Sequence, residues 1–260
     1  MTVSDIIRKT EELYPPHLAE EWDNVGLLVG DRDKEVRKVL IALDASDQAV
    51  ERAVSEKADL ILTHHPLIFK PLKRVTADDR IGRRILKMAA AGISYYAMHT
   101  NFDIAGMAAL NEGELGLVGT APLAVTGRTE EEDYGFGRIG HLKEAVTVRQ
   151  YASYVKEVYG LPDVRIYGDP EKRISCVAVC SGSGRSFVGE ALRNGAEVYV
   201  TGDIDYHTAI DAVSDGLILL DAGHYGTEFG YIAHMAGKIA EWFPEIEVIC
   251  EPIAQPYTSI

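Results

Sequence analysis

Two parts of this chain repeat the same order of a helix and a strand, and that repetition limits the folds open to it. Residues 186–203 align without a gap to residues 48–65 at a constant offset of 138 (201 − 63 = 138), which places Thr201 on Thr63. Helix-then-strand segments look alike in many proteins, so one such alignment is weak evidence by itself.

A second alignment follows in the same order along the chain. Residues 216–228 match residues 92–103 with one inserted residue, and each segment reads glycine, apolar strand, histidine, then a carboxylate four positions later. The pairs are His99 with Asp103 and His224 with Glu228. Two alignments in one order predict an internal duplication, and hence two similar lobes.

Short β-branched runs alternate with amphipathic segments in the first half of the chain. The expected strands are 36–44, 59–63 and 93–99, and the expected helices are 47–58 and 81–92. This alternation predicts the α/β class, with mostly parallel sheets flanked by helices in both lobes.

The composition is that of an ordinary folded protein and narrows the range of partners. Hydrophobic residues make up 47% of the chain, which is enough to bury a core. The formal net charge of −14 makes nucleic acid an unlikely partner, since nucleic acid requires a basic face, but a bound metal can still attract a small anion. The N-terminus lacks a signal-peptide pattern and no apolar run reaches the roughly 20 residues of a membrane span, so we expect a cytoplasmic protein with no membrane partner.

The polar groups with metal-binding chemistry all follow expected strands. They are His64 and His65 after 59–63, His99 and Asp103 after 93–99, and His224 and Glu228 after 217–223. Ligands of open α/β sheets bind at the carboxyl edge of the strands. Histidines with carboxylates and no thiolate predict a site for a borderline divalent metal such as Zn, Fe, Mn, Co or Ni.

The adjacent histidines favour two metal ions over one. Neighbouring side chains on a strand point to opposite faces, so His64 and His65 serve two ions side by side more readily than they chelate one. Five ligands would also overfill a single catalytic ion, which needs an open position. We therefore expect a dinuclear centre with hydrolytic chemistry.

This site also affects the expected domain organisation. We expect a first lobe over 1–125 and a second over 126–260, joined by an exposed stretch at 126–140 that is rich in charge and glycine. Because His224 and Glu228 are expected beside His64 and His65, residues 222–260 should return to the first lobe.

Three further motifs are open to two interpretations each. In 20–30, the loop either docks Trp22 into the core or uses Asp23 and Asn24 to orient the histidines. In 201–207, Asp203, Asp205 and His207 either line the cavity or belong to a solvated loop. The turn 180–186 either cradles phosphate or is structural, and the structural interpretation is favoured because it matches no phosphate-loop pattern.

The motifs together resemble those of a known family, the NGG-one-interacting factor three homologues, also called dinuclear metal centre or GTP cyclohydrolase I type 2-like proteins. The matching segments are EEWDNVGLLVG, LTHHPLIF, MHTNFD, TGDIDYH and DAGHYGTE, in that order, from residue 20 to 228. The resemblance implies two interlinked α/β lobes, in the compact form that lacks an inserted domain.

The resemblance also implies a ligand set, an assembly and an activity. The metal ligands fall on His64, His65, Asp103, His224 and Glu228, and His99 falls on a histidine near the metals. We expect His99 to act as a proton shuttle, because an imidazole exchanges protons near neutral pH. Members commonly form a toroidal homohexamer. The implied activity is metal-dependent hydrolysis of a nucleotide or related small molecule, as in a GTP cyclohydrolase. The alternative is a non-catalytic protein that binds or delivers metal, with a regulatory partner.

Overall fold

The computed structural model describes residues 1–252, 255 and 257, and the chain divides into two compact units. The first unit comprises Met1–Phe102 and the chain from Tyr231 to Pro252, and the second comprises Asp103–Gly230 together with Gln255 and Tyr257. The boundary expected after residue 125 falls inside a strand, Val118–Arg128, of the second unit. Residues 253–254, 256 and 258–260 of the expected second lobe lie outside the described residues.

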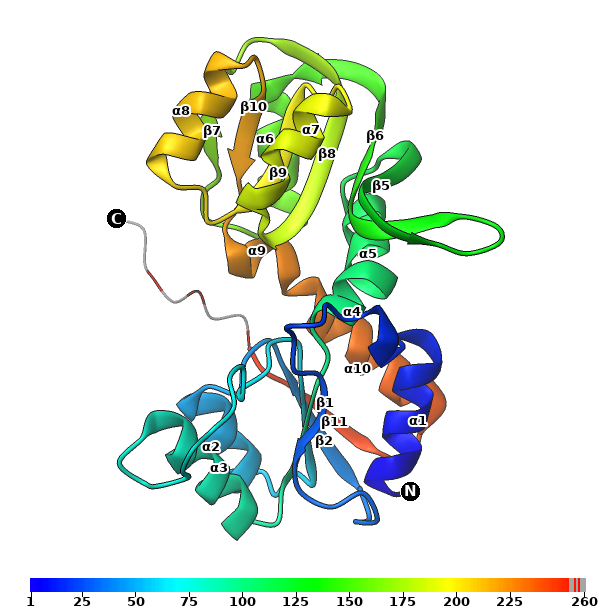
Figure 1. Ribbon diagram of the computed structural model, residues 1–260, viewed down its shortest axis with the longest axis vertical. Helices are drawn as coiled ribbons and strands as arrows, with labels where there is room; N and C mark the ends of the chain where they lie inside the picture. Colours follow the sequence, from blue (N-terminus) through cyan, green and yellow to red (C-terminus); the bar gives the residue numbers. More distant parts are fainter. Residues whose placement is uncertain (253–254, 256, 258–260) are drawn as a thin grey trace. The chain divides into compact units, whose positions relative to one another are not determined.

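The first unit is a five-stranded sheet with helices on both faces. Its strands, in spatial order, are β1 (Gly26–Val29), β4 (Ser94–Ala97), β3 (Leu60–Thr63), β2 (Lys38–Ala42) and β11 (Glu247–Cys250). Its helices are α1 (Val3–Leu13), α2 (Asp47–Ser55), α3 (Arg80–Ala90), α4 (Thr100–Phe102) and α10 (Gly230–Trp242). All pairings are parallel except that of β1 with β4. In Figure 1, α2 and α3 cover one face, and α1 and α10 cover the other.

The central strands are buried throughout because both faces are covered. Every residue of β3 and β4 is buried, the usual pattern for a parallel strand between two helical layers. Alternate residues divide between the faces, so Ile61 packs with Ala49 and Ala53 of α2 in one cluster. Ser46 begins α2 by accepting the Ala49 backbone N–H, as helix caps do.

The second unit has a six-stranded mixed sheet. Its strands, in spatial order, are β5 (Val118–Arg128), β6 (Asp133–Thr147), β8 (Arg173–Ser183), β9 (Val198–Gly202), β10 (Ile218–Asp221) and β7 (Arg165–Tyr167). Its helices are α5 (Ala108–Glu114), α6 (Val148–Val158), α7 (Val188–Arg193), α8 (Tyr206–Ser214) and α9 (His224–Glu228). Parallel pairing is confined to β8, β9 and β10.

The stretch 126–140 is part of a hairpin and not the exposed join that was expected. It contains the end of β5, a short turn and the start of β6, and the two strands pair antiparallel. Its glycines allow close strand contact, because a Cβ on Gly135 would lie 1.9 Å from the carbonyl oxygen of Ala124. The stretch rich in charge and glycine was therefore wrongly interpreted as the join between the two lobes.

The two sheets confirm the predicted duplication. The parallel order β2, β3, β4 in the first unit corresponds to β8, β9, β10 in the second, and each set carries an antiparallel strand at the same edge, β1 on β4 and β7 on β10. Even a capping contact repeats: Asp59 accepts the N–H groups of Arg37 and Lys38, and Glu197 accepts those of Ser175 and Cys176. The lobes therefore share one topology as well as one sequence pattern.

Among the described residues, none of the helices combines the length and the apolar character that crossing a membrane requires.

Candidate metal centre

Three histidines converge at the carboxyl ends of two neighbouring strands in the first unit. His64 and His65 follow β3 directly, and His99 lies two residues beyond β4. The strands are parallel, with Thr63 paired to Ala97, so their carboxyl ends meet at one edge of the sheet. One ring nitrogen from each histidine lies within 4.8 Å of those of the other two. This unit therefore holds a cluster of imidazoles that can bind a metal ion.

An oxygen fixes each of these imidazoles at its Nδ1 atom. The contacts are His64 Nδ1 to Met98 O at 3.1 Å, His65 Nδ1 to Asp44 Oδ1 at 3.2 Å and His99 Nδ1 to Asp23 Oδ1 at 3.0 Å. A carbonyl or an ionised carboxylate only accepts, so Nδ1 carries the proton in each ring. Nε2 is then the nitrogen able to bind metal, and an oxygen behind the ring is the usual support for a metal-binding histidine.

Asp23 is itself held by several donors. Its Oδ2 accepts the Thr100 backbone N–H at 3.0 Å and the Thr100 hydroxyl at 2.6 Å, and its side chain is fully buried. Burial alone would raise the pKa of Asp23, but the hydrogen bonds from His99 and Thr100 outweigh burial and lower the pKa to about 2. Asp23 therefore stays ionised and fixes the orientation of the His99 ring.

Trp22 and Asn24, which flank Asp23 in the sequence, contact the loop that follows His64 and His65. Asn24 donates its side-chain amide to the carbonyl of Ile68. Trp22 is 57% exposed, so the interpretation that it docks into the core is wrong. Its ring instead contacts Phe69, 5.6 Å between centroids, and meets the His99 ring edge-on at 6.0 Å.

The second unit presents a histidine and a carboxylate at the equivalent place, just after β10. His224 Nδ1 donates to Asp203 Oδ2 at 2.8 Å, and His224 Nε2 lies 3.3 Å from Glu228 Oε2. Glu228 is 3% exposed. Gly182 closes over this pair, because a Cβ there would lie 2.3 Å from Glu228 Oε1 and 3.3 Å from His224 Nε2. The lack of a side chain at Gly182 thus leaves room for the Glu228 carboxylate and the His224 ring.

Asp103 adds a second carboxylate in this unit. It opens a π-helical turn, Asp103–Met107, and one of its oxygens lies within 4.8 Å of one of Glu228. Such turns are often found at functional sites. Burial and the charges of Asp103 and Glu228 raise the pKa of the Cys180 thiol far above its usual value, which disfavours the thiolate form.

The other residues of the 201–207 motif have different surroundings. Asp205 caps α8 by accepting the N–H groups of His207 and Thr208. The His207 side chain is exposed on α8, where its ring packs edge-on against Tyr206. Asp203, by contrast, contacts a histidine of the candidate site, His224.

The turn 180–186 is structural. The backbone N–H of Gly182 donates to the Thr227 hydroxyl at 2.9 Å, and that of Gly184 donates to the Thr201 hydroxyl at 3.0 Å. These two donors are used within the protein, and the stretch consists of the end of β8 and the start of a short 3-10 helix, Gly184–Phe187, which supports the structural interpretation.

Sequence reasoning missed Asp44, which contacts His65. Its signal was available, because Asp44 lies two residues beyond β2, and β2 pairs in parallel with β3. A polar residue after a third parallel strand reaches the same edge of the sheet as the histidines.

The donor chemistry of both clusters fits divalent metal ions. Imidazoles whose Nδ1 atoms are already hydrogen-bonded present Nε2 lone pairs, and nearly buried carboxylates supply charge. Closely spaced carboxylates such as Asp103 and Glu228 also repel each other unless a cation or a proton lies near them.

Comparison with known proteins shows the family of this chain. The model of the family Duf34/NIF3 (NGG1p interacting factor 3) matches residues 1–256. The chain belongs to this family. Among other family members, a Clostridium perfringens protein named GTP cyclohydrolase 1 type 2 homolog is 35% identical over 93% of this chain and 92% of its own. A Streptococcus pneumoniae protein of the same name is 37% identical over 93% and 91%.

The Duf34/NIF3 fold is also known from solved structures. The crystal structure of a Bacillus cereus protein related to NIF3 matches this chain with a TM-score of 0.90 and 27% identity, over 100% of this chain and 99% of the other. The resemblance inferred from five short motifs is thus confirmed over nearly the whole chain, and so is the α/β fold with two sheets.

Proposed function

We propose that the protein is a dinuclear metal-dependent hydrolase that acts on a nucleotide or a related small molecule. The observation that carries the proposal is the cluster of His64, His65 and His99, in which three imidazoles with oxygen-supported Nδ1 atoms offer nitrogens within 4.8 Å of one another. A purely structural metal site is more often closed and rich in thiolates.

The proposed ligands are drawn from both duplicated segments. They are His64, His65, Asp103, His224 and Glu228. Two features support the choice: the histidine–carboxylate pairs follow corresponding strands, and two passages of the chain between the units lie close in sequence to Asp103 and Glu228. The chain leaves the first unit immediately before Asp103 and returns to it three residues after Glu228.

The bound ions would supply Lewis acidity and a nucleophilic water near neutral pH. The protein itself would supply His99 as the proton-transferring group, because Asp23 holds its Nδ1–H and fixes the ring. A neutral imidazole in a fixed orientation is suited to exchange a proton at Nε2. GTP is the first substrate to test, because relatives carry the name GTP cyclohydrolase 1 type 2 homolog. Opening its imidazole ring at C8 would consume two waters and release formate.

The decisive experiment combines metal content and turnover on the same samples. The protein is reconstituted separately with Zn, Fe, Mn, Co and Ni, its metal is counted by elemental analysis, and GTP, other nucleotides and phosphoesters are screened for release of formate or phosphate. We expect two ions per chain and turnover with at least one metal. Saturation at one ion would exclude the dinuclear centre.

Variants of the proposed residues separate binding from catalysis. We expect Glu228→Ala and Asp103→Ala to weaken both ions, because carboxylates can bridge, and His64→Ala or His65→Ala to weaken mainly one. His99→Ala should retain metal and lose about 10²–10⁴-fold in turnover, the usual contribution of general acid–base catalysis. Full occupancy by two ions without turnover of any substrate would instead favour a metal-binding or metal-delivery protein.

A further inference from the structure

A strongly basic segment stands out in this acidic chain. Residues 66–88 hold seven Lys or Arg and two Asp, a net charge of +5, whereas the whole chain carries −14, so the remainder carries −19 (−14 − 5 = −19). The segment begins directly after His65 and includes the loop before α3 and most of that helix. A local reversal of sign of this size creates a positive potential that attracts anions.

Part of this positive charge is not neutralised within the protein. Arg83 and Arg84 form salt bridges with Asp47, and Lys87 with Glu51. The remaining cations have no salt-bridge partner among the described residues; they are Lys70, Lys73, Arg74 and Arg80. All four are exposed and lie within eleven consecutive positions.

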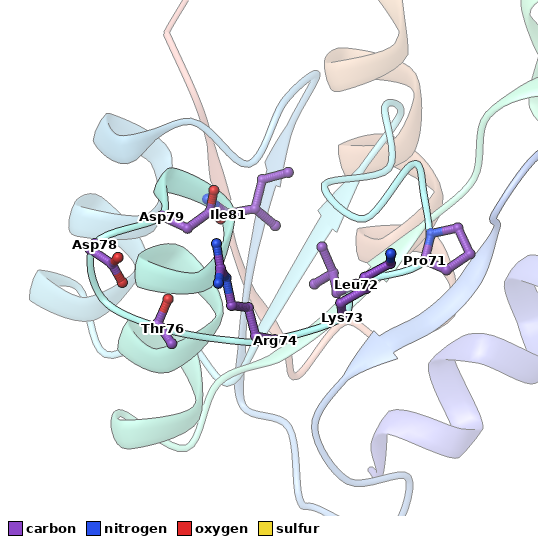
Figure 2. Close-up of a pocket in the computed structure, with 8 residues that line it drawn as sticks. All are labelled: Pro71, Leu72, Lys73, Arg74, Thr76, Asp78, Asp79 and Ile81. Carbon is purple, nitrogen blue, oxygen red and sulfur yellow. The ribbon is translucent and has the colours of Figure 1, made fainter.

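Two neighbouring pockets are lined by these cations. The larger, of about 600 Å³, is lined by Lys73 and Arg74 together with the start of α3 (Figure 2). The smaller, of about 200 Å³, is lined by His65, Arg80 and Arg84. Ile81 lines both pockets, so the cations border adjoining spaces that begin at a histidine of the candidate metal centre.

The acidic residues in these pockets already have roles within the protein. Asp79 caps α3 by accepting the N–H groups of Ile81 and Gly82, and Asp44 accepts from His65. Asp78 is the other acid in the larger pocket. The loop is held against the helix, because a Cβ on Gly82 would lie 2.3 Å from the carbonyl oxygen of Thr76.

We propose that these two pockets bind the phosphate chain of the substrate, with Arg80 nearest the metal centre and Lys73 and Arg74 farther along. This inference rests on the proposed function for the presence of a substrate at His65, and it specifies the class as a compound with two or more linked phosphates. Several cations bordering adjoining pockets suit an extended anion better than a single phosphate, and Arg80 can contact one phosphate group through two N–H donors.

The test measures binding without requiring turnover. Inorganic tripolyphosphate is titrated into metal-loaded protein by calorimetry, with wild type, Arg80→Gln and the double variant Lys73→Gln/Arg74→Gln compared at equal metal content. We expect Kd to rise about tenfold for Arg80→Gln and further for the double variant, since each loses charge-assisted contacts. Arg80→Lys should lose less, because it keeps the charge.

The matched control removes a cation elsewhere on the same unit. Arg37→Gln deletes an 85% exposed arginine near the start of β2, and it should leave Kd within about twofold of wild type, because exposed charges beyond a Debye length are screened. Equal Kd values for wild type, Arg80→Gln and the double variant would overturn the proposal. So would equal losses for Arg37→Gln and Arg80→Gln, which would indicate only a general charge effect.

The outcome can be separated from that of the proposed function. If no nucleotide turns over but the basic variants lose tripolyphosphate binding, the phosphate site stands and the hydrolase proposal fails. If GTP turns over and Arg80→Gln leaves both its KM and the tripolyphosphate Kd unchanged, the hydrolase stands and the phosphate site is wrong. A rise in KM at constant kcat would show that Arg80 binds the phosphates without taking part in the reaction.

Discussion

At the scale of single residues, this protein fixes each candidate metal-binding histidine with an oxygen at Nδ1. The oxygens come from a backbone carbonyl for His64 and from Asp44, Asp23 and Asp203 for His65, His99 and His224. His64 and His65 are adjacent in the sequence, but a different oxygen holds each ring. His64 is buried and His65 is partly exposed. This arrangement orients two neighbouring rings without requiring them to share one ion.

Gly182 provides a residue-scale test of the proposed ligand Glu228. A Cβ at Gly182 would lie 2.3 Å from Glu228 Oε1, so Gly182→Ala should displace the carboxylate and lower metal affinity at least tenfold. Because Gly182 has a φ of +65°, the variant should also lose about 1 kcal/mol of stability from backbone strain. Metal titration and thermal unfolding of the same sample measure the two effects.

Gly195→Ala is the control for that strain. Gly195 lies in the same unit with a φ of +78°, and a Cβ there would meet no atom within 4 Å. It should lose similar stability and retain normal metal affinity. Unchanged metal binding in Gly182→Ala would argue against Glu228 as a ligand.

At the scale of elements, a carboxylate directly before each of the duplicated strands β3 and β9 accepts hydrogen bonds from the neighbouring strand. Asp59 precedes β3 and Glu197 precedes β9, and each accepts two backbone N–H groups from the start of the neighbouring strand. This contact holds two parallel strands in register at the edge opposite the metal-binding histidines. An acidic residue repeated in the sequence can thus have a structural role while the histidines nearby have a functional one.

Substitution of Asp59 tests that role through stability and its pH dependence. We expect Asp59→Ala to lower the free energy of unfolding by about 1–3 kcal/mol, because two N–H groups lose a charged acceptor. Asp59→Asn, which keeps an acceptor, should lose less. Chemical denaturation at neutral pH measures both values, and equal stability of wild type and Asp59→Ala would contradict the structural role.

The pH dependence has a defined sign. Burial alone would raise the pKa of Asp59, but the N–H groups of Arg37 and Lys38 and the Lys34 ammonium outweigh it and lower the pKa below 3.8. A depressed folded-state pKa contributes stability above about pH 4 that is lost as the pH falls through the folded-state value. The difference in stability between wild type and Asp59→Asn should therefore shrink as the solution is acidified below pH 4.

At the scale of the whole molecule, the chain forms two units, and the first is built from two segments that are far apart in the sequence. The first unit takes its last helix, α10, and its edge strand, β11, from the end of the chain. Each unit has its own buried core. Within residues 1–252 the chain passes from one unit to the other twice, once at Asp103 and once shortly after Glu228.

Assembly is the prediction that belongs to this scale. From the family resemblance we propose a homo-oligomer larger than a dimer, with a hexamer of about 171 kDa (six chains of 28.5 kDa) as the expected species. Light scattering after size-exclusion chromatography, repeated over a dilution series, measures the mass. A single species of one chain at micromolar concentration would reject the proposal, and the series would show whether dissociation depends on concentration.

The sequence by itself determined the features that depend on local patterns. Alternating apolar runs and amphipathic segments predicted the parallel strands and their helices, and the repeated glycine–strand–histidine–carboxylate order predicted two lobes of one topology, with His64, His65, His99 and His224 at strand ends. These inferences succeeded because side-chain periodicity and strand direction are set by residues close in sequence.

Only the tertiary structure decided the features that depend on distant partners. Asp23 reaches His99 across 76 positions, Asp44 supports His65, and residues 126–140 pair as a hairpin where a join was expected. Trp22 lies exposed and Asp205 caps a helix, although each resembled a site or core residue in the sequence. A side chain's role depends on which donor, acceptor or surface meets it in the folded chain, and one sequence carries no direct record of those long-range contacts.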